Sequence, residues 1–239
     1  MAVAYKRILL KMSGEALAGE RGFGIDAAVT GQVASEIKAV HAMGVQIALV
    51  IGGGNFFRGA SARAAGMVRT EADTVGMLAT IMNSLLFKQA LENAGVETVV
   101  LSALKVDKAA EFYTPRTARR HLAYNRVVII AGGTGNPYFT TDTAAALRSA
   151  ELQCDVMLKA TKVDGVYDSD PSKNPQAVKI DTITHLKALQ MNIRVLDATA
   201  FSMCMENGIT IIVFKLLEPG NLKKCVEGKK IGSIVKKGG

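Results

Sequence analysis

The chain has 239 residues, of which 49% are hydrophobic and 21% charged, and a formal net charge of +8. This composition is ordinary for a soluble globular protein, and no apolar run approaches the roughly 18 residues that a membrane-spanning helix needs. The positive charge is compatible with nucleic-acid binding, but the lysine pairs are short and no aromatic residues interleave with them, which favours an ordinary basic surface.

The N-terminal segment and the cysteines bear on location. Lys11 interrupts the first apolar run after only three residues, so we expect no export signal. Cys154, Cys204 and Cys225 are odd in number and lack the spacing of metal ligands, which favours reduced thiols. We therefore expect a cytoplasmic protein that is not bound to a membrane.

Strand and helix patterns alternate along the chain. Apolar, β-branched runs predict strands at residues 7–11, 45–51, 96–101, 127–131, 156–159 and 209–214. Asp26 is placed to cap a helix that ends before Gly44, and a longer helix runs from about Glu71 to Gly95. Asp197 is placed to cap a further helix, which ends at residue 208.

The order of these elements predicts the fold class. Strands separated by helices imply parallel pairing with right-handed crossovers, so both faces of the sheet should be covered. The chain shows no repeat, no low-complexity tract and no linker. The expected fold is a three-layer αβα sandwich with a mainly parallel central sheet, built as one domain over residues 1–239.

Four loops follow predicted strands, which is where open α/β sheets bind their ligands. In chain order they read KMSGEALAG, GGGNFFRG, GGTGNPYFTTDTAAALR and KATKVDGVYDSDP. Each loop alone is explained by a tight turn. Together, their glycines bring bare N–H groups close to an anion, Lys11 and Arg58 supply positive charge, and threonine hydroxyls supply further donors. The combination indicates a site for several phosphate groups.

Common phosphate and metal motifs do not account for these loops. The pattern G-x-x-x-x-G-K-[ST] is absent, and the stretches GGGNFF and GTGNPY lack the third small residue of a dinucleotide-binding motif. Asp164, Asp168 and Asp170 are followed by Pro171, which does not fit a calcium-binding loop. Phosphoryl transfer on another scaffold is the interpretation that remains.

These loops resemble those of the bacterial-type uridylate (UMP) kinases in the amino-acid kinase superfamily. The matching pieces KMSGEAL, GGGNFFRG, GMLAT, GGTGNPYFTTDTAA and KATKVDGVYDSDP lie in the family's order over nearly the whole chain. One departure is Val75, which stands where the family usually has methionine. The resemblance implies that ATP donates a phosphoryl group to UMP, giving UDP and ADP with Mg²⁺, and it assigns no protein side chain as a metal ligand.

The resemblance also implies which residues hold each nucleotide. ATP would be held by Lys11, Met12, Ser13, Gly14, Gly54, Arg58, Thr161, Tyr167 and Asp170. UMP would be held by Gly53, Asp73, Thr134, Gly135, Asn136, Pro137, Tyr138, Phe139, Thr140 and Thr141. The catalytic residues would be Lys11, Arg58, Asp142 and Lys162.

Three aspartates have a structural interpretation beside the functional one. Asp142 precedes a predicted helix and either caps it or orients the ammonium groups of Lys11 and Lys162, and the two roles are compatible. Asp73 precedes the long helix, so it is either an N-terminal cap or an acceptor of hydrogen bonds from UMP. Asp197 has a similar ambiguity, and we interpret it as a cap.

Assembly and regulation follow from the resemblance alone. It implies a homohexamer with UTP as inhibitor and GTP as activator. The segment GERGFG, which consists of Gly19, Glu20, Arg21, Gly22, Phe23 and Gly24, matches the region associated with GTP activation. A flexible glycine loop is the alternative interpretation of this segment.

Three alternative functions remain. Another kinase of the same superfamily would act on an amino acid, carbamate or isopentenyl phosphate, but GTGNPYFTTD resembles the UMP-binding segment in particular. A nucleotide-binding regulator without turnover would not need Lys11, Arg58 and Asp142 together. A nucleic-acid-binding protein would bind DNA with a steep dependence on salt.

Overall fold

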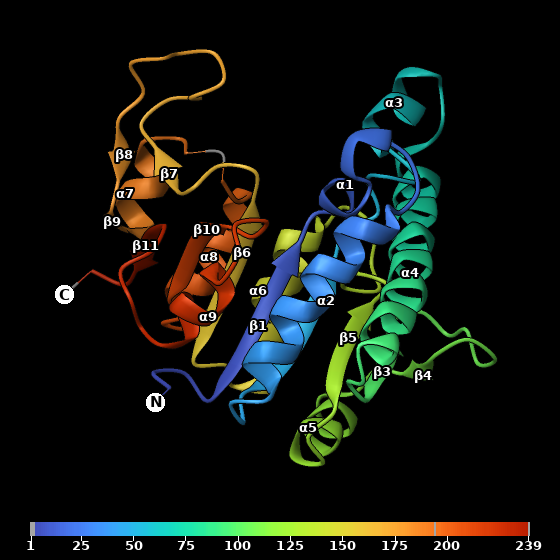
Figure 1. The fold of residues 1–239 in the computed structure, drawn as a ribbon. Coiled ribbons are helices and arrows are strands. Elements are labelled where there is room, and N and C mark those ends of the chain that lie inside the picture. The colour runs from blue at the N-terminus through green and yellow to red at the C-terminus, as the bar shows by residue number, and fades with distance from the viewer. Residues whose placement is uncertain (1–2, 194, 239) are drawn as a thin grey trace.

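A central sheet with helices on both faces forms the protein (Figure 1), as the alternation of strand and helix patterns predicts. The computed structural model describes residues 3–193 and 195–238. Residues 1–2, 194 and 239 of the predicted domain range lie outside the described residues. None of the described helices is long and apolar enough to cross a membrane.

The described residues form a sheet of nine strands. In sheet order they are β4 (Glu111–Phe112), β3 (Thr98–Ser102), β5 (Val127–Ala131), β2 (Gln46–Ile51), β1 (Arg7–Met12), β6 (Val156–Thr161), β10 (Ile211–Lys215), β11 (Ser233–Lys236) and β9 (Thr182–Thr184). Every neighbouring pair is parallel except β10 with β11, so the sheet is mainly parallel, as predicted. A separate antiparallel pair joins β7 (Val166–Tyr167) to β8 (Lys179–Ile180).

The helices lie in two layers, one on each face of the sheet. In chain order the helices are α1 (Gly14–Leu17), the short 3₁₀ helix η1 (Gly19–Arg21), α2 (Ala27–His41), α3 (Gly59–Ala64), α4 (Arg69–Asn93), α5 (Pro115–Ala123), α6 (Thr141–Leu152), α7 (His185–Gln190), α8 (Ala198–Glu206) and α9 (Asn221–Val226). Buried side chains of α2, α4 and α9 form one hydrophobic core with the sheet, and those of α5, α6, α7 and α8 form the other. The three-layer prediction is confirmed.

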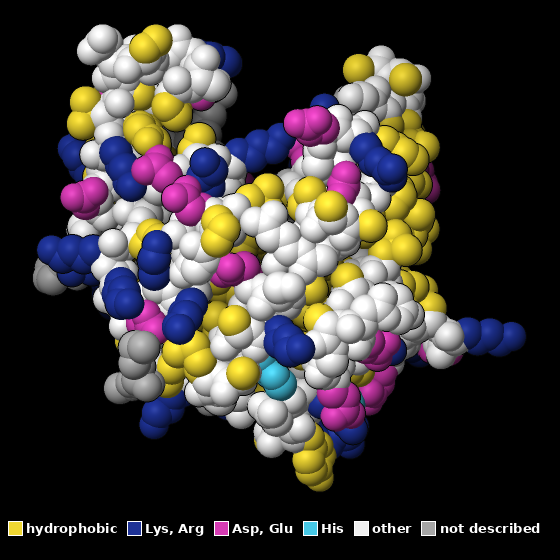
Figure 2. All heavy atoms as spheres, in the orientation of Figure 1, with side chains coloured by type: hydrophobic (Ala, Val, Ile, Leu, Met, Phe, Trp, Pro, Cys, Tyr) yellow, Lys and Arg dark blue, Asp and Glu magenta, His cyan; other side chains and the backbone are white. Residues whose placement is uncertain are grey.

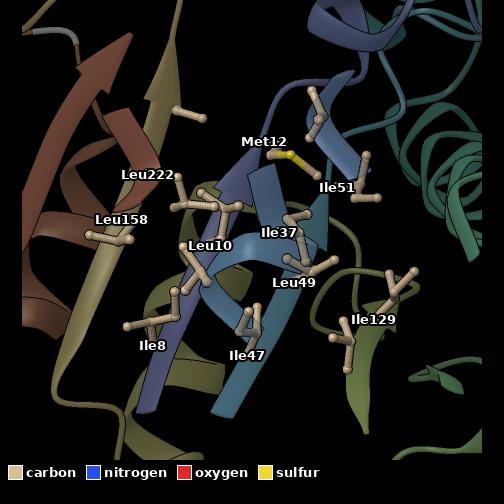
Figure 3. Packing of buried hydrophobic residues seen from close by; sticks show 14 of the residues in the cluster. Ile8, Leu10, Met12, Ile37, Ile47, Leu49, Ile51, Ile129, Leu158 and Leu222 are labelled. Atoms are coloured by element: carbon tan, nitrogen blue, oxygen red, sulfur yellow. The ribbon is translucent and has the colours of Figure 1, made fainter. Parts of the chain in front are cut away.

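Side chains of β1 alternate between the two cores, and this alternation positions the site. Ile8, Leu10 and Met12 point toward α2 and pack with strand residues such as Leu49 (Figure 3), whereas Leu9 belongs to the core under α6. Burying a Leu or Ile side chain stabilises a fold by about 1.5–3 kcal/mol, so the register of β1 is strongly specified. Lys11 has the same parity as Leu9 and therefore faces the α6 layer.

Helix caps confirm two sequence predictions and correct two others. Asp26 accepts hydrogen bonds from the N–H groups of Ala28 and Val29, and Asp197 accepts one from Ala200. The N-cap of α6 is Thr140, so Asp142 lies in the first turn and does not cap the helix. Helix α4 begins two residues before the predicted start, at Arg69, and its N-cap is Val68. Asp73 is therefore inside α4 and has no capping role.

Candidate functional site

The four predicted loops leave the carboxyl ends of adjacent strands. They follow β1, β2, β5 and β6, which stand side by side in the order β5, β2, β1, β6. Figure 2 shows the molecule hollowed between the part that carries β7 and β8 and the part that carries α1 and α3 in Figure 1. The carboxyl edge of the parallel sheet thus brings together the residues that the sequence places far apart.

Two lysines and one aspartate form the centre of this edge. The ammonium Nζ of Lys11 lies 2.7 Å from Oδ1 of Asp142, and Nζ of Lys159 lies 2.5 Å from Oδ2 of the same carboxylate. Lys11 and Lys159 are directly paired in the parallel register of β1 and β6, and their residues are only 7% and 8% exposed. Asp142 comes from the first turn of α6. Two ammonium groups and one carboxylate leave one net positive charge at the edge of the sheet.

Electrostatic coupling within this cluster shifts two pKa values. Burial alone would raise the pKa of the Asp142 carboxyl, but Lys11 and Lys159 outweigh it and hold that pKa below its usual value. Burial lowers the pKa of Lys159 to about 8, against the opposing attraction of Asp142. The carboxylate is therefore ionised at neutral pH, and Lys159 keeps its proton there but loses it under mildly alkaline conditions.

The second lysine at Asp142 differs from the sequence prediction. Lys162 was expected at this carboxylate, but Lys159 occupies that place. Lys162 is exposed and lines a different cavity of about 510 Å³, together with Glu20 and Leu216. The reason is strand alternation: residue 159 has the parity that faces the α6 layer, whereas Ala160 faces the opposite core and Lys162 follows the end of β6.

A cavity of about 160 Å³ lies beside the cluster, between the turn after β2 and the loop after β5. Its lining includes Gly53, Gly54, Phe57, Asp73, Thr80, Gly133, Phe139, Thr140 and Thr141. Five of the ten residues predicted to hold UMP therefore share one cavity. Residues 134–138 form the loop that leads to this lining, and their side chains are half-buried or exposed.

Three side chains fix the loop that precedes α6. The backbone N–H of Tyr138 donates to Oδ2 of Asp73 at 2.8 Å, which ties the loop to α4. The hydroxyl of Thr80, also on α4, accepts from the N–H of Gly132 at 2.8 Å. Arg148, which is 4% exposed, donates to the carbonyl oxygen of Gly133 at 3.2 Å from within α6. Thr80 and Arg148 were not identified from the sequence, because nothing local distinguishes a helix residue that holds a distant loop.

A larger cavity of about 590 Å³ lies on the other side of the cluster, under the β7–β8 pair. Lys159, Thr161, Tyr167 and Asp170 all line it, together with Val166 and Ile193 among others. An adjoining cavity of about 430 Å³ shares Lys159 and Ile193 and reaches Asp142. Thr161, Tyr167 and Asp170 are three of the residues predicted to hold ATP, and the structure brings them together around one space that reaches Lys159.

Asp197 has more contacts than the capping role that the sequence predicts. It accepts hydrogen bonds from the hydroxyls of Thr140 and Thr143, the latter at 3.0 Å, as well as from the N–H of Ala200. It therefore joins the N-terminus of α8 to the N-terminus of α6. Because Asp142 is in the first turn of α6, Asp197 helps to fix the helix that carries the central carboxylate.

The remaining predicted phosphate-binding residues follow the ends of β1 and β2. Gly14 begins α1, directly after Met12 and Ser13, and Gly54 follows Gly53 in the turn after β2. Arg58 is not at the lysine cluster: its guanidinium pairs with Oε1 of Glu15 at 2.9 Å and its side chain is 63% exposed. An ion pair this exposed contributes little to stability, so Arg58 can change partner at low cost.

The segment from Gly19 to Gly24 lies beside the same turn. Phe23 is 67% exposed and its ring meets that of Phe56 edge-on, with 5.6 Å between centroids. The N–H of Gly24 donates to the carbonyl oxygen of Asn55 at 3.2 Å. The segment is thus attached to the turn that follows β2.

The described residues contain no group of three or more His, Cys, Asp or Glu side chains that is arranged to hold a metal ion. Both oxygens of Asp142 already face lysines. A metal ion at this edge would therefore need most of its oxygen ligands from a bound substrate and from water, which is common for Mg²⁺.

Comparisons with known proteins agree with this geometry. The model of the amino acid kinase family matches residues 6–215. The crystal structure of UMP kinase from Bacillus anthracis superposes with a TM-score of 0.95 at 34% identity, over 98% of this chain and 97% of that chain. UMP kinase from Ureaplasma parvum matches with a TM-score of 0.91 at 39% identity, over 97% and 99%. Uridylate kinase from Archaeoglobus fulgidus matches with a TM-score of 0.74 at 29% identity, over 95% and 99%.

Proposed function

The chain belongs to the amino acid kinase family, and from this premise we propose that it is a UMP kinase, which transfers the γ-phosphoryl group of ATP to UMP. The observation that carries the proposal is the Lys11–Asp142–Lys159 cluster. Lys159 lines one cavity with three of the residues expected to hold ATP, and five of the residues expected to hold UMP line another. The products would be UDP and ADP, and the UDP would enter pyrimidine nucleotide synthesis in the cytoplasm.

The proposed reaction needs charge neutralisation more than proton transfer. A phosphate oxygen of UMP forms a bond to the γ-phosphorus of ATP while the bond from that phosphorus to the leaving oxygen of ADP breaks. The attacking oxygen is already ionised at neutral pH, so no general base is required. Lys11 and Lys159 would donate hydrogen bonds to the migrating group, and Asp142 would hold both ammonium groups in place.

Mg²⁺ is proposed to accompany ATP. When bound, it neutralises part of the charge on the donor phosphates. We assign it no protein ligand, because Asp142 is committed to Lys11 and Lys159. Arg58 at the mouth of the site is proposed to exchange Glu15 for a donor phosphate when ATP binds.

A test of the proposed function is the release of ADP from ATP with a panel of acceptors. We expect UMP to support the highest kcat/KM, well above those of CMP and AMP. The panel also contains an amino acid, carbamate and isopentenyl phosphate. A preference for any of these three would favour the alternative kinases of the same family, and release of ADP with none of the acceptors would favour a regulator without turnover.

The acceptor site makes a further prediction through Asp73. We propose that its carboxylate accepts a hydrogen bond from a ribose hydroxyl of UMP in addition to the N–H of Tyr138. A buried acceptor left without its partner costs about 1–3 kcal/mol, and more when it is charged, so wild type should prefer UMP over dUMP. We expect Asp73→Ala to narrow the UMP/dUMP ratio of kcat/KM, chiefly by impairing UMP.

A second variant separates this role from loop attachment. Arg69 pairs with Asp73 at 3.6 Å and lies over the ring of Tyr138, so Arg69→Ala weakens the same loop attachment without removing the carboxylate. It should lower kcat/KM for UMP and dUMP by the same factor. If Asp73→Ala also lowers kcat/KM for UMP and for dUMP by the same factor, Asp73 only holds the loop, and the proposed hydrogen bond to the ribose hydroxyl is wrong.

The pKa of Lys159 gives a pH prediction. Its value of about 8 in the free protein lies below the usual 10.5, so the charged form is lost as the pH rises through about 8, and kcat/KM should decrease there. An arginine keeps its charge over this range. The alkaline decrease should therefore move to higher pH in Lys159→Arg, whereas Lys162→Arg should follow the wild-type profile. If the alkaline decrease in activity occurs at the same pH in Lys159→Arg as in wild type, a group other than Lys159 causes the decrease.

Self-association is also proposed, in the form of a homohexamer. Helix α4 exposes Leu78, Met82 and Leu86 on one face, at 44%, 48% and 48% of their surface. In Figure 2 hydrophobic side chains follow the right edge of the molecule, where α4 lies in Figure 1. An apolar stripe of this kind on a 25-residue helix supports contact with a second copy.

Regulation by GTP and UTP is the last part of the proposal. GTP would activate through the segment from Gly19 to Gly24, and UTP would inhibit. The attachment of Gly24 to Asn55 supports a path from that segment to the turn that faces both nucleotides. The effector would act by changing the position of this turn.

A further inference from the structure

Two asparagine side chains form a closed hydrogen-bonded pair beneath the glycine turn. Asn83, in the middle of α4, is 0% exposed, and Asn55, in the turn after β2, is 2% exposed. Nδ2 of Asn83 donates to Oδ1 of Asn55 at 2.6 Å, and Nδ2 of Asn55 donates back to Oδ1 of Asn83 at 2.9 Å. Such reciprocal amide bonds, away from water, define one relative orientation of the two side chains.

The second N–H of each amide holds a different loop. Nδ2 of Asn83 donates to the carbonyl oxygen of Gly52 at 2.7 Å, and Nδ2 of Asn55 donates to the carbonyl oxygen of Gly24 at 2.6 Å. All four N–H groups of the pair are therefore used, and both side-chain oxygens accept a bond. The pair connects α4, the turn after β2 and the end of the segment from Gly19 to Gly24.

The loop after β1 lies directly against the same pair. A Cβ atom added to Gly14 would lie 2.2 Å from Oδ1 of Asn55 and 2.8 Å from Nδ2 of Asn83. These distances are far shorter than any van der Waals contact, so only glycine allows this approach. The backbone expected at the donor phosphates and the turn that carries Gly53 thus lie against one buried polar centre.

We propose that Asn55 and Asn83 are positioning residues, which fix two loops relative to each other. One is the loop after β1 that carries Gly14, called the donor-side loop below, and the other is the turn after β2 that carries Gly53 and Gly54. The inference rests on the proposed function, because it concerns the distance between the two bound nucleotides. Neither asparagine contacts a nucleotide in this account. An apolar pair of similar size would fill the space, but it would leave the carbonyl oxygens of Gly52 and Gly24 without these donors.

The effect of losing the pair should appear in kcat. A misplacement of about 1 Å between reacting groups reduces rates by up to about 10²-fold. We expect Asn83→Leu to lower kcat by roughly 10- to 100-fold at saturating ATP and UMP, with smaller changes in the two KM values. Asn55→Ala should lower kcat in the same direction.

The matched control is Ser84→Ala. Ser84 is the next residue on α4, is 0% exposed, and donates to the carbonyl oxygen of Thr80 within the helix. The substitution removes a buried side-chain hydrogen bond, as Asn83→Leu does, but this bond stays within α4 and does not reach the turn or the donor-side loop. We expect its kcat to remain at the wild-type value.

A double-mutant cycle tests whether the two asparagines act together. If they form one positioning unit, the Asn55→Ala, Asn83→Leu double variant loses no more kcat than the worse single variant. If the fold-losses in kcat of the two single variants multiply in the double variant, the two substitutions cause separate packing defects, and the proposal is overturned. Single variants that keep wild-type kcat at a temperature where they are folded would also overturn the proposal. If Asn83→Leu does not fold, Asn55→Ala decides by the same criterion.

Hydrogen exchange distinguishes failure of this inference from failure of the proposed function. The N–H groups of Phe56 and Phe57 both donate to the carbonyl oxygen of Gly53. Their protection in the free protein should fall in Asn83→Leu and remain unchanged in Ser84→Ala, whether or not the protein phosphorylates UMP. Unchanged protection at Phe56 and Phe57 in Asn83→Leu would overturn the positioning role even if UMP kinase activity is present.

Discussion

Lys11→Met is expected to lower kcat for UDP formation by about 10²–10³-fold while KM for UMP changes little. Lys11 is 7% exposed and its ammonium group is held 2.7 Å from Asp142, so burial and the ion pair define its position before substrates bind. A fixed charge of this kind stabilises negative charge that develops on the migrating phosphoryl group. Binding of UMP depends on a different cavity and should be preserved.

Lys162→Met is the control for this substitution. It makes the same chemical change three residues after Lys159, at a side chain that lines the cavity beside Glu20. Its kcat should remain close to wild type, and Lys159→Met should resemble Lys11→Met. Wild-type kcat in Lys11→Met, or equal losses in Lys159→Met and Lys162→Met, would contradict the proposed site. Steady-state kinetics with both substrates varied provide the comparison.

Asp142→Asn is expected to lower both turnover and stability. The isosteric amide removes the carboxylate that both Lys11 and Lys159 contact, and leaves two buried, adjacent ammonium groups without that counter-charge. Loss of one partner from a buried ion pair costs about 3–5 kcal/mol in the free energy of unfolding. The ammonium groups would also lose their fixed orientation, so we expect kcat to fall on the order of 10²-fold.

The stability loss in Asp142→Asn should depend on pH in a defined direction. Without the carboxylate, the folded-state pKa of Lys159 falls further below the value of about 10.4 in the unfolded chain. The unfolded chain then binds more protons than the folded one at alkaline pH, so stability rises with pH there. The free energy of unfolding of Asp142→Asn, measured by urea denaturation at about pH 7 and about pH 9, should therefore differ less from that of wild type at the higher pH. A difference that grows at about pH 9 would mean that the lysines are not the cause.

The pattern of strands, helices and loops was predictable from the sequence because it depends on local signals. The six long strands appear as apolar runs, and the glycines at 44, 95 and 208 adopt the left-handed conformation that follows a helix end. The short strands β4, β7, β8, β9 and β11 were not predicted. They have two to four residues each and are defined by their pairing partners, so their sequences carry little periodicity.

The site was predictable as a set of loops but not in its detailed contacts. Lys11, Asp142, Thr161 and Tyr167 were identified from motifs. Lys159 was missed although one rule could have found it, because β1 and β6 are adjacent and residue 159 has the parity of a site-facing position. Strand order was needed to apply that rule, and the sequence does not contain it explicitly.

Other contacts depend on tertiary structure alone. Asp197 meets Thr140 and Thr143 across two helix N-termini, and Asn83 meets Asn55 across 28 residues of chain. A helix residue that supports a distant loop shows no local sequence pattern, because the packing of α4 and α6 against the sheet determines which group it meets. The position of Asp73 inside α4 likewise depends on where the helix begins, and helix boundaries are weakly encoded.

The most direct test of the account follows the phosphoryl group itself. ATP labelled at its γ-phosphate is mixed with UMP and an excess of enzyme, and the labelled products are separated after a single turnover. We expect the label to move to UDP in the wild-type protein and the transfer rate to fall by about 10²–10³-fold in Lys11→Met. Label that stays in ATP, or that reaches UDP equally fast in both proteins, would contradict the claim that phosphoryl transfer to UMP takes place at the Lys11–Asp142–Lys159 cluster.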